Sequence, residues 1–71
     1  MEFTWEPGFE IRVSVQKDGA TLISANRQGL VSLANNLLAL SLEKPVEHFH
    51  LDEHNSLEDG SSELIVELVE G

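Results

Sequence analysis

The sequence contains no cysteine and only four lysine and arginine residues. Without cysteine, a disulfide scaffold, a thiol nucleophile and a Cys-ligated zinc or iron–sulfur site are excluded. Because the chain has thirteen aspartate and glutamate residues, its formal net charge is −9. Phosphate backbones and anionic lipids repel so acidic a chain, which argues against binding to nucleic acid or to a membrane.

Long apolar runs and clustered glycines are missing as well. No apolar run reaches the length of a membrane span, and the chain does not open with the basic and apolar regions of a signal peptide. The five glycines are too widely spaced for a phosphate-binding loop, and no nucleophile motif accompanies the histidines. We therefore expect a cytoplasmic protein that is not an enzyme and holds no cofactor.

The 71 residues that are present suffice for one small domain, and a hydrophobic content of 41% argues against disorder. Residues 1–9 hold the single tryptophan and two of the three phenylalanines, and Pro7-Gly8 marks a turn there. We expect an aromatic N-terminal arm over residues 1–9 and one α+β domain over residues 10–71. These numbers favour a small binding or interaction module.

Residues 10–25 have the pattern of a β-hairpin. Residues 10–16 alternate between polar and apolar, residues 20–25 form the returning strand, and Asp18-Gly19 between them suits a two-residue type I′ turn. That turn pairs Val15 with Leu22 and Val13 with Ser24. It predicts that Ile11, Val13, Val15 and Leu22 face the core.

Residues 27–42 have the spacing of a helix, with Asn26 as its N-cap and Lys44-Pro45 as its end. Gly29 should cost this helix about 1 kcal/mol relative to alanine. We expect the leucine-rich stripe to pack on a sheet; it comprises Leu30, Leu33, Ala34, Leu37, Leu38 and Leu40. The narrow polar face then comprises Gln28, Ser32, Asn35, Asn36 and Glu43.

Two further strands are predicted, over residues 46–51 and 62–69. In the first, Phe49 and Leu51 face one side and His48 and His50 the other. In the second, the core-facing residues are Leu64, Val66 and Leu68. The order is therefore β-β-α-β-β, an α+β fold with one helix packed on a four-stranded, mainly antiparallel sheet.

One helix cannot cover both faces of such a sheet. The helix-free face should carry Ile23, Ile65 and Val69, which the Phe3/Trp5 arm or a second copy of the chain would have to cover. The sequence thus suggests a homodimer, formed through this face or through an edge strand.

All three histidines fall within seven residues, at His48, His50 and His54. On a strand, His48 and His50 project to the same side about 7 Å apart, so they could share a divalent transition metal such as zinc. Asp52 or His54 could add a third ligand. The same pattern is also that of an ordinary polar strand face. The alternative function is a small metal-binding or structural homodimeric module that uses the strand face of His48 and His50.

Acidic residues concentrate in residues 43–71, where nine carboxylates face one cationic residue, Lys44. Such a segment can serve solubility alone, or it can steer a basic partner and speed its encounter. The candidate partner-binding residues lie on the third strand and the connection after it: Glu47, His48, His50, Asp52, Glu53, Glu58 and Asp59. A basic groove on the partner is the surface that these carboxylates would occupy.

The order of elements and several residue strings resemble the immunity protein 32 family of bacterial polymorphic-toxin systems. The similarity covers about residues 10–69 and is carried by the hairpin, by the leucine-rich segment, by His48-Phe49-His50-Leu51-Asp52, and by residues 57–67. The Phe3/Trp5 arm lies outside it. The resemblance implies a small cytoplasmic antitoxin that binds and neutralises a cognate toxin domain, with no catalytic role.

Overall fold

The computed structural model describes all residues, 1–71, and contains five elements in the predicted order. They are the strands β1 (Ile11–Val15) and β2 (Thr21–Ala25), the helix α1 (Arg27–Ser41), and the strands β3 (His48–Leu51) and β4 (Leu64–Glu67). The α+β class and the order β-β-α-β-β are confirmed. The helix α1 is not long and apolar enough to cross a membrane.

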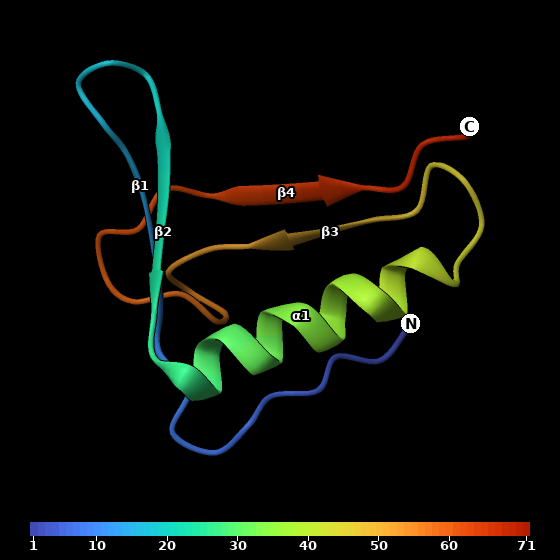
Figure 1. Cartoon of the computed structure of the whole chain (residues 1–71), viewed down its shortest axis with the longest axis horizontal. Coiled ribbons are helices and arrows are strands. Elements are labelled where there is room, and N and C mark those ends of the chain that lie inside the picture. The colour runs from blue at the N-terminus through green and yellow to red at the C-terminus, as the bar shows by residue number, and fades with distance from the viewer.

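The strands do not join into the single four-stranded sheet that the sequence predicts. They form two separate antiparallel pairs, β1 with β2 and β3 with β4. The connection after β3 occupies the free edge of β1, because the Glu58 N–H donates to the Ile11 carbonyl (2.9 Å) and the Ser62 N–H to the Val13 carbonyl (2.8 Å). With that edge taken, neither β3 nor β4 can pair there. In Figure 1 the hairpin stands across one end of α1, β3 and β4.

The hairpin pairs one residue away from the predicted register. Val13 lies opposite Ile23 and Val15 opposite Thr21, because the loop has three residues, Lys17 to Gly19, instead of two. The Gly19 N–H donates to the Gln16 carbonyl (2.9 Å), and Gly19 has a φ of 89°, which glycine tolerates best. A shift of one residue moves a strand's side chains to the opposite face.

This shift corrects the predicted core. Ile11 and Val13 are buried as expected, with exposed fractions of 0% and 1%. Leu22 is exposed because the shifted register turns it to the outer face. Val15 is exposed too, since it lies at the far end of β1, next to the turn.

The helix begins where the sequence predicts, but its orientation differs. The Asn26 Oδ1 atom accepts from the Gly29 N–H (2.7 Å), which confirms Asn26 as the N-cap. The buried residues of α1 are Gly29, Ser32, Leu33, Asn36 and Leu40. Leu33 and Leu40 are buried in the core as predicted, but the rest of the leucine stripe is exposed, so the stripe as a whole does not pack on a sheet.

The N-terminal arm explains this orientation of α1. It runs along the helix, where the Thr4 N–H donates to the Asn36 Oδ1 atom (2.9 Å) and the Glu6 N–H to the Ser32 hydroxyl (2.8 Å). These two polar side chains are buried because arm backbone satisfies them, whereas the sequence assigns them to the exposed polar face.

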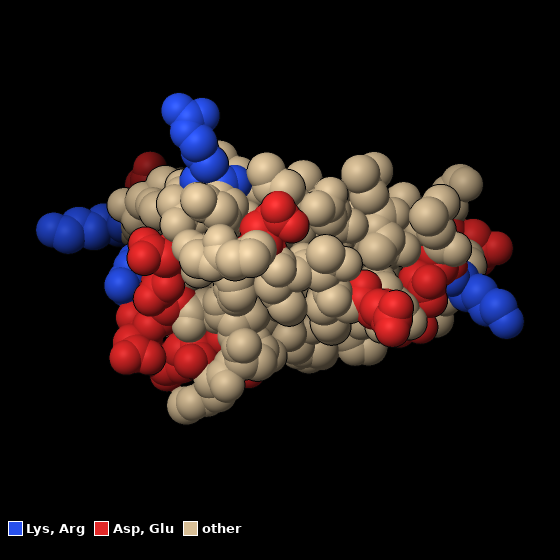
Figure 2. Space-filling model, turned by 90° about the horizontal axis from the view of Figure 1, so that it is seen from below, with Lys and Arg blue, Asp and Glu red and all other residues tan.

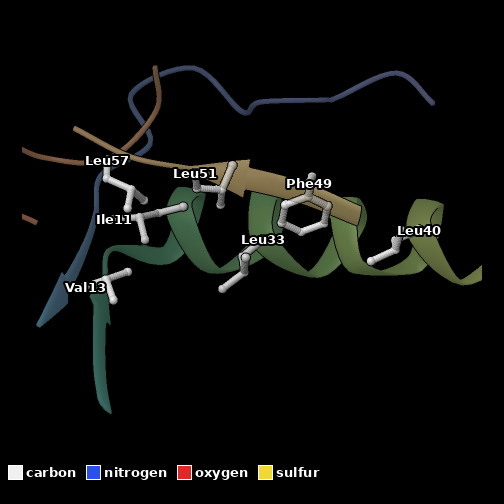
Figure 3. Packing of buried hydrophobic residues seen from close by; sticks show 7 residues of the cluster. All are labelled: Ile11, Val13, Leu33, Leu40, Phe49, Leu51 and Leu57. Carbon is white, nitrogen blue, oxygen red and sulfur yellow. The ribbon is translucent and has the colours of Figure 1, made fainter. Parts of the chain in front are cut away.

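The core lies between α1 and β3, with β1 closing one end (Figure 3). Its seven buried hydrophobic residues are Ile11, Val13, Leu33, Leu40, Phe49, Leu51 and Leu57. The arm completes it: the Phe3 ring packs edge-on against Phe49 at 5.5 Å, and Trp5 stacks on Phe9 at 4.7 Å. The arm therefore does not cover the predicted helix-free face, where Ile65 and Val69 stay exposed. Ile23 is exposed as well, although the shifted register places it opposite the buried Val13.

Candidate partner-binding surface

The connection between β3 and β4 is a structured loop with its own backbone hydrogen bonds. The Asp52 carbonyl accepts from the N–H groups of Asn55, Ser56 and Leu57, and the buried Leu57 side chain anchors the loop in the core. The loop is also attached to β1, since the Arg12 Nη1 atom donates to the Asp59 carbonyl (2.7 Å). The acidic residues of this loop are therefore held at fixed positions.

The four loop carboxylates divide into two pairs. The Asp52 Oδ1 atom accepts from the His54 N–H (2.8 Å), and the Glu53 Oε2 atom accepts from the Gly60 N–H (2.7 Å). These two carboxylates support the loop. The Glu58 and Asp59 carboxylates take part in none of the hydrogen bonds or ion pairs within the chain, so they are free to meet a partner.

The histidines lie on the exposed side of β3, while Phe49 and Leu51 on its other side are buried, as the alternation predicts. The His48 and His50 rings meet edge to face with their centroids 5.0 Å apart. The His50 Nδ1 atom lies 3.1 Å from the Glu63 Oε2 atom, a pairing that the sequence does not reveal. Glu47, just before β3, is exposed too, although the alternation places it on the side of Phe49 rather than with the histidines.

The structure does not assemble the predicted metal ligands. No group of three or more histidine, aspartate or glutamate residues is placed to hold a metal ion. The Asp52 carboxylate is directed at the backbone of His54, and the His54 side chain is highly exposed at 85%. The pair of His48 and His50 is thus part of an exposed polar strand face.

An open hollow of about 370 Å³ adjoins Glu58. It lies between the start of β1, the end of β2 and the loop, and is lined mainly by polar residues: Glu10, Ile11, Arg12, Ser24, Ala25, Asn26 and Glu58. An enclosed, largely apolar cavity is what a small substrate requires. This open polar hollow is better suited to a side chain presented by a protein partner.

A second exposed surface was not expected from the sequence. It is the outward side of α1, formed by Leu30, Val31, Leu37, Leu38 and Leu42, and we call it the apolar stripe. The only sequence signal for it is that Ser32 and Asn36 share a helix face with Leu33 and Leu40, since residues three and four apart lie on one side. Figure 2 shows the side of the molecule with α1 and the arm as mostly uncharged, with acidic residues mainly toward its two ends.

Fold and surface together define a small α+β protein whose acidic loop and histidine pair are exposed. The model of immunity protein 32 matches residues 20–69, from the start of β2 to just beyond β4. The chain therefore belongs to the immunity protein 32 family. The arm and β1 lie outside the matched residues. Neither the curated proteins nor the solved structures include a match to this chain.

Proposed function

We propose that this chain is an immunity protein that binds a cognate toxin domain directly and neutralises it in the cytoplasm. The observation that carries the proposal is the family match over residues 20–69, which includes α1, both strands of the second sheet and the loop between them. Binding requires no catalytic group, cofactor or metal from the chain. The toxin is the partner, and its activity is blocked by occupation of its surface.

The contact surface that we propose is the acidic loop with the exposed row on β3. It comprises Glu47, His48, His50, Asp52, Glu53, Glu58 and Asp59. Two features support it: the loop is held rigid against β1, and the Glu58 and Asp59 carboxylates are left without partners in the chain. A rigid surface loses little conformational entropy on binding, and unpaired carboxylates can attract a basic groove.

The test is the association rate with the cognate toxin domain, measured by stopped flow at low and physiological salt. The double variant Glu58→Lys/Asp59→Lys reverses the two free carboxylates and leaves the loop's own hydrogen bonds intact. Its association should be slower by about tenfold at low salt, and the difference should shrink at 0.15 M because the screening length there is about 8 Å.

The matched control is Glu2→Lys/Glu70→Lys, which changes the net charge equally at two exposed residues outside the loop. It should associate almost as fast as the wild type. If both double variants slow association equally, the loop has no special role and only net charge matters. If neither has any effect at either salt concentration, the acidic residues serve solubility alone. The wider reversal, of Asp52, Glu53, Glu58 and Asp59 together, should slow association more.

A further inference from the structure

The apolar stripe is large for so small a protein. Leu30 and Leu38 are exposed to 54% and 64%, and Leu42 at the end of the helix to 85%. At 1.5 Å per residue the stripe is about 18 Å long. Counted as exposed side chain it amounts to roughly 500 Å², within the range of the largest apolar patches on monomers, which are often functional.

The stripe lies in a part of the chain that is almost free of charge. Between residues 20 and 42 the only charged residue is Arg27, at the start of α1, whereas the other residues carry thirteen acids. Two copies of a protein with a net charge of −9 repel each other at most orientations. Contact through the stripe is the orientation that brings uncharged surface against uncharged surface.

The chain also has few other means of stabilisation. Only seven hydrophobic residues form the buried core, and there is no cysteine to add a disulfide. Proteins of about 70 residues with such small cores are commonly stabilised by disulfides, metals or oligomerisation. The exposed aliphatic side chains on α1 are the surface that oligomerisation would bury.

We propose that two copies of this chain pair through the apolar stripe, with their α1 helices antiparallel about a twofold axis. The stripe runs from Leu30 to Leu42, so an axis at its middle sets Leu30 against Leu42 of the second copy and Ala34 against Leu38 of the second copy. Arg27 then lies beside the C-terminal end of the other helix, where carbonyl groups and the helix dipole favour a cation. A parallel pair would instead set the two Arg27 side chains together.

The area available for burial is small, which favours a weak pairing. Two stripes bury roughly 1,000 Å² in total, which is at the lower limit for a specific interface. A dimer of this size should dissociate in the micromolar range. The stripe and the acidic loop share no residue, so the pairing does not depend on the proposed binding of a toxin.

Analytical ultracentrifugation of the full chain between about 1 and 500 μM tests the pairing. The wild type should pass from monomer to dimer over this range. Leu38→Glu and Leu42→Lys introduce opposite charges at two stripe positions, and each should keep the chain monomeric at all concentrations. Circular dichroism should show folded variants, because both side chains are mostly exposed.

The matched control is Ile65→Glu, which places the same charge on an exposed aliphatic residue of β4. It should dimerise like the wild type. If Ile65→Glu abolishes the dimer and Leu38→Glu does not, the sheet face is the interface and the proposal is wrong. A wild type that is monomeric at 500 μM also overturns the proposal. So does the result that stripe variants lose toxin binding while their oligomeric state is the same as that of the wild type.

Orientation is tested by crosslinking, for which a chain without cysteine is convenient. Under oxidation, Ala34→Cys mixed with Leu38→Cys should give a disulfide-linked pair in high yield, since antiparallel helices bring these positions together. Leu38→Cys alone should crosslink poorly. Efficient crosslinking of Leu38→Cys with itself would show a parallel pair and contradict the antiparallel arrangement.

Discussion

Gly29 lies where α1 passes closest to the start of the first hairpin. A Cβ atom at this position would collide with the Glu10 carbonyl oxygen and press on the side chains of Ile11 and Ala25. The Glu10 carbonyl also accepts from the Asn26 N–H (3.2 Å), so the backbone there cannot easily move away. The glycine that weakens the helix in isolation is therefore what allows the helix and hairpin to pack.

Gly29→Ala tests this close approach. In an unobstructed helix the substitution would stabilise the protein by about 1 kcal/mol. Here we expect it to lower the free energy of unfolding by about 2 kcal/mol, because overpacking against backbone costs about 1–3 kcal/mol. Urea denaturation followed by circular dichroism gives the sign, and a stabilised variant would contradict the packing described.

Val46 has a φ of 67°, the left-handed region that β-branched residues avoid. Its N–H donates to the Leu68 carbonyl (2.8 Å) just before β3 begins, and its side chain is 72% exposed. The hydrogen bond holds the backbone in a strained conformation, and little apolar burial depends on the side chain.

Val46→Asn should therefore raise the free energy of unfolding by about 1 kcal/mol, since asparagine tolerates this region better. Val69→Asn is the matched control: it removes another exposed valine, at a position with ordinary φ, and should give no gain. Thermal unfolding of both variants measures the difference. Equal melting temperatures for the two variants would show that Val46 is not strained.

At the scale of elements, the N-terminal arm determines which side of α1 is buried. Its backbone binds Ser32 and Asn36, and its aromatic rings pack on Phe49 and on one another. The Asn36 Nδ2 atom is buried without a hydrogen-bond partner, a local cost that the contact with Thr4 offsets. The arm is thus an integral part of the fold.

Ser32→Ala should lower the free energy of unfolding by about 1 kcal/mol, because it leaves the half-buried Glu6 N–H without its acceptor. Ser41→Ala is the matched control, since the Ser41 hydroxyl is exposed and donates only to the Leu38 carbonyl of the same helix. Chemical denaturation of the two variants should separate them. Comparable losses, or none in Ser32→Ala, would mean that the arm does not depend on this contact.

Local patterns predicted the elements well, because each depends on neighbouring residues. The cap at Asn26, the end of α1 before Pro45, and the alternation of Phe49 and Leu51 with the histidines all follow from the sequence. The sequence did not predict the hairpin register correctly, because Asp18-Gly19 fits both a two-residue turn and the three-residue loop that forms.

The predictions that were wrong concern features that depend on long-range contacts. Ser32 and Asn36 are buried by arm residues that lie 26 and 32 positions away in sequence, respectively. The periodicity within the helix does not indicate these contacts. The separation of the two sheets likewise results from the loop after β3 binding to β1. Of the candidate site, the sequence identified the acidic loop and the histidine row, but it did not predict the exposed stripe.

At the scale of the whole molecule, charge and apolar surface are separated along the chain. Acidic residues concentrate after α1, while residues 20–42 carry one charge and most of the exposed leucines. The two surfaces suit different contacts: the acidic loop a basic groove, and the stripe another apolar surface. The two proposed contacts, with a toxin and with a second copy, therefore use different residues of the chain.

The central claim, that this member of the immunity protein 32 family neutralises a toxin, is tested most directly by survival. Bacteria that express the cognate toxin domain are plated with and without this chain, and viable colonies are counted. An unrelated acidic protein at the same expression level serves as control. We expect the chain to restore viability to that of cells without toxin while the control does not. Equal killing with and without the chain, both proteins being expressed and folded, would contradict the account.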